Sequence, residues 1–210
     1  MTLTADAIRR ALDAYPLVDI PALPGRTNHL RAGVLVPLVL SPEPYCLVTE
    51  RTAHLNQHGG EVSFPGGKPD PEDGTLERTA LREAEEELGI TGAEVLGELS
   101  AMPLYTSDWR LVPYVAAVPE GPLTPSPVEV ARVFRMSLID WLDRPYLDGI
   151  PYTMMGLSSH SPVFDLDGVP MYGGTAHTFY ELLQIVAPLL GREVPPFRAG
   201  RFNWPDLLGL

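Results

Sequence analysis

The sequence predicts one α/β or α+β domain, residues 1–210, in which a mixed β-sheet lies between helices. Helical periodicity at 4–14, 76–88 and 175–190 alternates with short apolar runs of strand length. No internal repeat or linker interrupts the chain, and 210 residues suit one domain.

The first elements are an amphipathic helix at 4–14 and a hairpin. We expect strands at 33–40 and 45–49, joined by the turn Ser41 to Pro44. Pro37 lies inside the first of these strands, which predicts an edge position or a bulge. A short strand at 61–64 leads into Pro65, Gly66 and Gly67, and a loop rich in Pro and Asp follows from Lys68 to Gly74.

The segment 76–88 is predicted to form a helix, with Thr75 as N-cap or first-turn residue and Gly89 as stop. At about 100° per residue, its apolar residues form one arc. Glu83, Glu86 and Glu87 fall on the adjacent arc, and Glu85 points toward solvent. Like charges at these spacings repel by a few tenths of a kcal/mol each. Arg82 can pair with Glu86 but cannot neutralise three acids, whereas a hard cation such as Mg²⁺ can bind carboxylates together with substrate phosphates.

The second half of the chain is predicted to contain more strands than helices. We expect strands at 95–105, 111–118 and 129–136, with a proline-rich surface loop at 120–127 and a short helix at 138–142. A hairpin is expected at 163–166 and 169–172 because Asp167-Gly168 is a favoured turn pair. The last helix covers 175–190, and the tail from Arg192 has no clear periodicity.

Composition narrows the classes of function. The formal net charge of −12 disfavours nucleic-acid binding. There is no apolar run of membrane-spanning length and no secretory leader pattern, and the single Cys46 favours the cytoplasm. Oligomeric state is left open.

The residues Arg82 to Ile90 resemble the second half of the Nudix box, Arg-Glu-apolar-x-Glu-Glu-x-Gly-apolar, at every defined position. Gly67 resembles its opening glycine. Two departures occur: the interval from Gly67 to Arg82 is one residue longer than the general pattern, and Gly74 stands where a glutamate is usual. Either Asp73 or Glu72 takes over from that acid, or the acid is absent.

The upstream residues resemble the coenzyme A pyrophosphatase branch of this family. Matching positions are Arg51, Gly60, 62–67 and Glu72, while Asn56 occupies a position where a second arginine is usual. The segment 172–176 resembles the Gly-x-Thr-Ala segment that opens the last helix of that branch. The similarities span about 31–190 and imply a Nudix fold.

The resemblance implies a metal-dependent pyrophosphohydrolase that uses Mg²⁺ or Mn²⁺ and cleaves coenzyme A to 3′,5′-ADP and 4′-phosphopantetheine. It implies Glu86 and Glu87 as metal ligands, Glu83 as a third ligand or as the group that orients water, and a carbonyl of Gly66 or Gly67 completing the shell. Arg82 would hold Glu86.

The remaining roles are less closely tied to the motif. Glu129 is the first choice for general base and Glu120 the second, and Arg51 and Lys68 are candidate phosphate contacts. The histidines His54, His58 and His177 are expected to be structural or exposed, and Ser63 to pack.

Two alternatives remain open. One is a Nudix hydrolase of another nucleoside diphosphate derivative, such as ADP-ribose or NADH. The other is a non-catalytic nucleotide-binding sensor, against which the intact three-acid helix argues.

Overall fold

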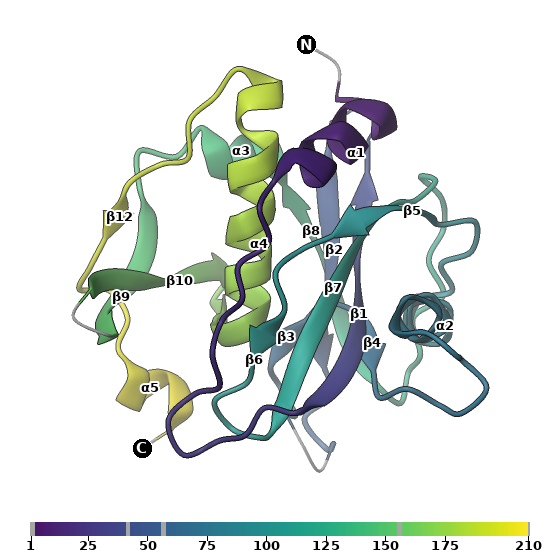
Figure 1. Cartoon of the computed structure of the whole chain (residues 1–210), viewed down its shortest axis with the longest axis horizontal. Coiled ribbons are helices and arrows are strands. Elements are labelled where there is room, and N and C mark those ends of the chain that lie inside the picture. Colours follow the sequence, from purple (N-terminus) through teal and green to yellow (C-terminus); the bar gives the residue numbers. More distant parts are fainter. Residues whose placement is uncertain (1–2, 41–42, 56–57, 155–156, 210) are drawn as a thin grey trace.

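The computed structural model describes residues 3–40, 43–55, 58–154 and 157–209 (Figure 1). Its helices are α1 (Ala5–Ala14), α2 (Leu76–Leu88), α3 (Leu138–Leu142), α4 (Gly173–Val186), the 3₁₀ turn η1 (Pro188–Leu190) and α5 (Trp204–Leu208). Its strands are β1 (Leu30–Val39), β2 (Tyr45–Arg51), β3 (Val62–Ser63), β4 (Gly66–Gly67), β5 (Glu94–Glu98), β6 (Met102–Pro103), β7 (Trp109–Ala117), β8 (Val130–Ser137), β9 (Leu147–Met154), β10 (Leu157–Leu166), β11 (Val169–Met171) and β12 (Phe197–Arg198).

The described strands form two sheets. In the larger one, the order β3-β2-β1-β7-β5 is extended by β4 on β1, β6 on β7 and β8 on β2; the smaller one has the order β11-β10-β9-β12. The pairing of β1 with β7 is parallel, and that of β1 with β2 is antiparallel. The predicted mixed sheet between helices is therefore confirmed.

Two apolar clusters occupy opposite faces of the larger sheet. Leu35, Leu47 and Val112 pack against Ala80 and Ala84 of α2. On the other face, a larger cluster brings residues of the same strands together with α1, α3 and α4. In Figure 1, α2 lies at the right of the sheet and α4 at the left. The period-two alternation of β1 and β2 produces this division because successive side chains point to opposite faces.

The ends of α2 follow the prediction. The Thr75 side chain accepts a hydrogen bond from the Arg78 amide, an N-cap that contributes about 1 kcal/mol. Gly89 ends the helix in the left-handed region, with φ 70°. The beginning of the helix lies directly on β1, where a Cβ at Gly33 would overlap the Leu76 carbonyl oxygen. This close approach sets the position of α2 on the sheet.

The prediction of an edge strand or a bulge at Pro37 is wrong, because β1 is flanked on both sides. Leu30 N–H bonds toward β7, and Leu35 N–H bonds to the Pro65 carbonyl on the opposite side. Alternation directs the Pro37 nitrogen to the Pro65 side, between the pairings with β4 at Val34 and with β2 at Leu38. Pro37, which has no amide hydrogen to donate, therefore lies where β1 changes its partner from β4 to β2.

The single strand expected at 95–105 is divided into β5 and β6. Between them, both the amide and the hydroxyl of Ser100 donate to the Glu181 carboxylate of α4, at 3.0 and 2.5 Å. Glu181 is only 6% exposed, so this interaction is internal. A contact between residues so far apart along the chain leaves no local pattern.

Other elements also differ from the prediction. The last helix begins at Gly173 and ends at Val186, with η1 after it. Much of the β9–β10 hairpin was not predicted because Gly149, Pro151 and Pro162 interrupt its alternation. The expected turn at Asp167 is confirmed, with positive φ at Asp167 and Gly168.

The tail has structure that its sequence did not indicate. β12 pairs in parallel with β9, and α5 follows. Arg198 and Arg201 both pair with the buried Asp148, at 3.3 and 3.0 Å. These ion pairs attach the tail to the smaller sheet.

Candidate active site

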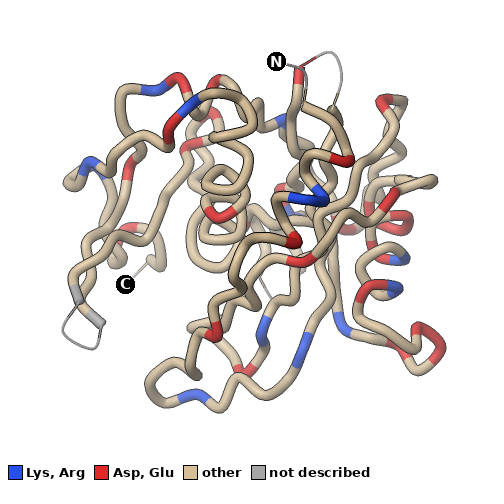
Figure 2. The backbone as a smooth tube through the Cα atoms, turned by 45° about the horizontal axis from the view of Figure 1, so that its top comes forward, with Lys and Arg blue, Asp and Glu red and all other residues tan. Residues whose placement is uncertain are grey.

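The acidic helix α2 lies against the glycine strand β4. Figure 2 shows acidic positions along this helix, at the right, and in the loop before it. β4 pairs with β1, with Gly67 opposite Gly33 and Gly66 opposite Val34. A Cβ at Gly66 would lie 2.6 Å from the Gly33 oxygen and the Val34 Cα, so only glycine allows this approach.

Glu87 is the most buried acid of the site, with 2% exposure. The Gly66 amide donates to its Oε1 at 3.2 Å. Burial raises the pKa of Glu87 to about 7, while the Gly66 amide and the Arg51 charge act in the opposite direction. The negative charges of Glu129 and Glu83 raise this pKa further. Such a carboxylate needs a proton or a cation to be stable in this position.

Glu83 lies beside Gly67. A Cβ at Gly67 would lie 2.6 Å from the Glu83 Cδ, so the absence of a side chain makes the space for this carboxylate. Burial raises the pKa of Glu83, and the neighbouring Arg82, at 3.1 Å, partly offsets this. Glu83 and Glu87 therefore meet at the two glycines.

Glu86 is more peripheral, with a side chain 58% exposed. Arg82 Nη1 donates to its Oε2 at 3.1 Å, which confirms the predicted contact. Glu85 is exposed, also as predicted. Within the described part of the chain, no three His, Cys, Asp or Glu side chains are grouped closely enough to hold a metal ion as they stand.

Asp73 is the principal partner of Arg82. Its two carboxylate oxygens accept from Arg82 Nε at 2.9 Å and Nη2 at 3.1 Å, and the Thr79 hydroxyl and Asp70 amide also donate to it. These donors hold the pKa of Asp73 well below its usual range. Glu72 is exposed. Of the two acids considered for the Gly74 position, Asp73 is therefore the one that contacts Arg82.

The loop that carries Glu129 is attached to the end of α2 by backbone hydrogen bonds. The amides of Thr124 and Ser126 donate to the carbonyls of Leu88 and Glu87, at 2.9 and 2.8 Å. The Glu129 charge raises the pKa of both Glu83 and Glu87. The second choice for general base, Glu120, is exposed at the beginning of this loop.

The candidate phosphate contacts, Arg51 and Lys68, have different surroundings. Arg51 ends β2, and its Nε is buried without a hydrogen-bond partner among the described residues. Ser63 is similar: its Oγ is buried and unpartnered within the described chain. The Lys68 ammonium lies over the Trp109 ring, 5.3 Å from its centre, and Asn56 lies outside the described residues.

The histidines have other surroundings. His54 is exposed. His58 Nδ1 lies 3.0 Å from a Glu61 oxygen, a contact that raises the pKa of His58. His177 Nε2 lies 3.0 Å from the Ser161 hydroxyl, and burial lowers the pKa of His177 to about 4.

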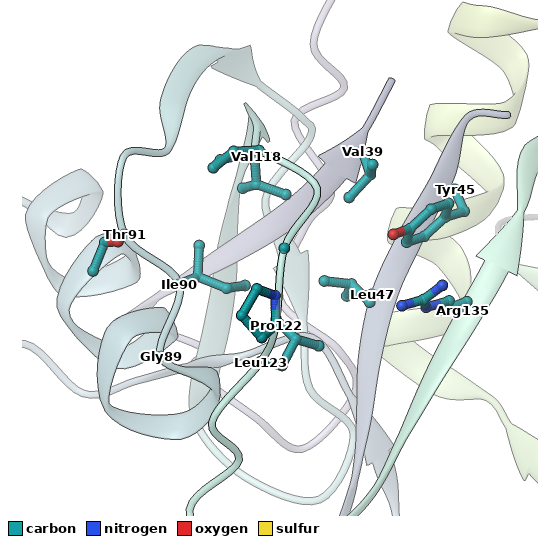
Figure 3. Close-up of a pocket in the computed structure, with 12 residues that line it drawn as sticks. Val39, Tyr45, Leu47, Gly89, Ile90, Thr91, Val118, Pro122, Leu123 and Arg135 are labelled. Carbon is teal, nitrogen blue, oxygen red and sulfur yellow. The ribbon is translucent and has the colours of Figure 1, made fainter. Parts of the chain in front are cut away.

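A pocket of about 280 Å³ lies beyond the C-terminal end of α2 (Figure 3). Its lining is mostly apolar and includes Val39, Leu47, Ile90 and Leu123, with Arg135 at one side. None of the acids discussed above lines it. The pocket is therefore separate from the acidic site.

The donor set at the glycine turn suits a hard divalent cation. Carboxylate oxygens of Glu83 and Glu87 and nearby backbone carbonyls are the ligands that Mg²⁺ and Mn²⁺ prefer. The space beside Gly67 that holds the Glu83 carboxylate fits such an ion. Glu87 fits it as well, because burial raises its pKa to about 7 and a cation would stabilise its charged form.

Comparisons with known proteins identify the family of this chain. Residues 29–151 match the family model described as NUDIX domain. Two proteins, each named "Uncharacterized Nudix hydrolase NudL", are similar. The one from Yersinia enterocolitica is 42% identical over 127 residues, which cover 55% of this chain and 65% of the relative. The one from Photorhabdus laumondii is 43% identical over 131 residues, which cover 60% of this chain and 69% of the relative. The chain thus spans about two thirds of the length of these relatives.

A solved structure has a similar fold. The MutT/nudix family protein from Enterococcus faecalis aligns with a TM-score of 0.50 and 15% identity, covering 91% of this chain and 76% of that one. The family model covers more than half of the residues, from the residue before β1 to the middle of β9. The chain therefore belongs to the NUDIX domain family.

Proposed function

We propose that this protein is a metal-dependent pyrophosphohydrolase that cleaves coenzyme A to 3′,5′-ADP and 4′-phosphopantetheine in the presence of Mg²⁺ or Mn²⁺. The observation that carries the hydrolase proposal is that Glu83 and Glu87 lie together at Gly66 and Gly67. Two neighbouring buried carboxylates repel each other unless a cation or a proton neutralises them, and a bound cation can also activate water.

In this proposal, Glu83 and Glu87 would hold the metal, with Glu86 and a carbonyl of Gly66 or Gly67 completing its ligands. The bound ion would neutralise the phosphate charge that an acidic protein otherwise repels. Arg82, held by Asp73, keeps Glu83 and Glu86 oriented. Loss of such supporting contacts typically costs 10–100-fold in activity or metal affinity.

Glu129 is proposed as the general base. It would accept the proton of the attacking water, and its loop is anchored to α2 through backbone hydrogen bonds rather than through flexible side chains. Arg51 and Lys68 are proposed to contact the phosphates.

The coenzyme A assignment is supported by two segments that resemble the same branch of the family. Strand β3 carries one, and β11 leads directly into the other at Tyr172; the two strands contact each other. Burial raises the pKa of Tyr172, and the Glu61 charge raises it further, consistent with this proximity. Residues that share a substrate are expected to lie together in this way.

The substrate is tested by incubating the protein with coenzyme A, ADP-ribose and NADH in Mg²⁺ or Mn²⁺ and separating the products. We expect 3′,5′-ADP from coenzyme A. Cleavage of ADP-ribose or NADH without 3′,5′-ADP from coenzyme A would refute the substrate assignment but retain the hydrolase. No cleavage of any substrate would favour a nucleotide-binding sensor.

The site is tested with glutamate-to-glutamine variants, each with a matched control on the same helix or loop. Glu86→Gln should lower kcat by about 100-fold or more, whereas Glu85→Gln, on the solvent side, should stay near wild type. Glu129→Gln should lower kcat by about 10²- to 10⁴-fold, the usual contribution of a general base, and Glu120→Gln should not. An active Glu86→Gln or Glu129→Gln enzyme would show that the assigned role is wrong.

A cytoplasmic location and a small nucleotide as the partner belong to the same proposal. The single cysteine, Cys46, is free and buried. Across the described ranges, no helix is both long and apolar enough to cross a membrane.

A further inference from the structure

Lys68 connects the two faces of the larger sheet at the glycine turn. Its carbonyl accepts from Arg82 Nη2 at 3.3 Å, on the side of α2. Its ammonium lies over the Trp109 ring, 5.3 Å from the ring centre. One residue therefore has its backbone tied to the acidic site and its charge placed on an aromatic ring.

Trp109 lies on the face opposite α2. It is the first residue of β7 and pairs with Leu30 of β1. Side chains alternate along a strand, so Trp109 shares its face with Leu111, which packs against the cluster on the α4 side. A Cβ at Gly174, at the beginning of α4, would lie 3.2 Å from Leu111, so α4 begins close to this face.

The ring remains partly accessible, and its companion Lys68 is exposed. A lysine over an indole face in water contributes only about 0.5–1 kcal/mol, so another group can displace it. A planar base can stack on the same face, and the released ammonium can then pair with a phosphate.

Lys68 follows Gly67 directly, so it joins the acidic site to the indole ring. Among the described residues, β4 pairs only with β1, so no further strand pairs with its other edge. A phosphate bound at Glu83 and Glu87 can thus belong to a molecule that continues past Lys68 to the indole ring.

We infer that Trp109 is a base-recognition residue: its ring stacks on the purine of the nucleotide half of the substrate, and Lys68 moves from the ring to a phosphate when the base arrives. This inference rests on the proposed function for the nature of the ligand. It adds a residue outside every motif discussed above.

The test uses two ligands that differ only by the base, AMP and ribose 5-phosphate, in Mg²⁺. Neither contains a phosphoanhydride, so binding is measured without turnover. Trp109→Leu should weaken AMP binding by about 5- to 100-fold, the range expected from base–aromatic stacking, and leave ribose 5-phosphate binding within twofold of wild type. Lys68→Met should weaken both ligands.

Tryptophan fluorescence supplies a second readout because the chain has only three tryptophans. Trp141 is buried, and Trp204 packs edge-on against Tyr172. AMP should quench the emission of wild type and of the control Trp204→Phe, and this quenching should be absent from Trp109→Leu.

Wild-type AMP affinity in Trp109→Leu, or no AMP binding by the wild-type protein, would overturn the inference. Equal losses for AMP and ribose 5-phosphate in Trp109→Leu would also overturn it, since that result indicates distortion of the phosphate site. Because turnover is not measured, failure of coenzyme A hydrolysis is a separate outcome.

Discussion

Gly67→Ala tests whether the space beside the turn is needed for the Glu83 carboxylate. The new Cβ would lie 2.6 Å from the Glu83 Cδ, whereas carbon atoms in contact are separated by about 3.5 Å or more. The carboxyl group must therefore move by about 1 Å. Misplacement by about 1 Å typically costs about 10²-fold in rate, so we expect kcat to fall about 100-fold and the Mg²⁺ requirement to rise.

The assay is steady-state hydrolysis over a Mg²⁺ titration, with thermal unfolding measured in parallel. Gly67→Ala should remain folded because the clash is with a side chain that can rotate. Gly66→Ala should unfold or melt far lower, since its Cβ meets the backbone of Gly33 and Val34. Gly121→Ala is the matched control, with no atom within 4 Å of the new Cβ. A Gly67→Ala enzyme with wild-type kcat and Mg²⁺ dependence would refute the reasoning.

Two further predictions concern groups outside the metal ligands. Asp73→Asn removes the charged partner of Arg82, so kcat should fall about 10- to 100-fold. The control Glu72→Gln should leave kcat unchanged. Equal kcat values for the two variants in steady-state assays would contradict this prediction. Burial lowers the pKa of His177 to about 4, so the folded state favours the neutral ring. The contribution of this residue to the free energy of unfolding is fully present above about pH 6.5. It falls by about 3 kcal/mol as the pH is lowered to 4, because the unfolded chain binds the proton first. Urea unfolding of His177→Gln across this range should show a correspondingly flatter pH profile than wild type, unlike the exposed-site control His54→Gln; parallel profiles for His177→Gln and wild type would contradict the burial argument.

The sequence predicted the acidic helix well because every signal for it is local. Thr75, the apolar arc and Gly89 lie within one short segment, and the structure has the same helix from Leu76 to Leu88. The three acids were treated as one group, however. Their exposures differ, from 2% for Glu87 to 58% for the Glu86 side chain, because β4 and the loop before β8 cover only one side of the arc.

The features that the sequence did not reveal depend on distant contacts. Asp73 could be named only as one of two alternatives because the longer loop shifts the spacing, and its geometry with Arg82 selects it. Trp109 belongs to no motif and becomes visible only when β1 brings β4 and β7 together. The division of β5 from β6 likewise depends on Glu181, far along the chain.

The proline-rich loop before β8 has a consequence for how this chain tolerates insertions and deletions. Thr124 and Ser126 alternate with Pro125 and Pro127, which have no amide to donate, and both available amides bond to the end of α2. Their side chains are not used in these bonds, so many substitutions should be accepted there. One residue added or removed between 124 and 129 would change which amide meets which carbonyl and would shift Glu129 relative to the acids. Changes of loop length should therefore be accepted near Gly121, where the chain is exposed, and not in the last six residues before β8.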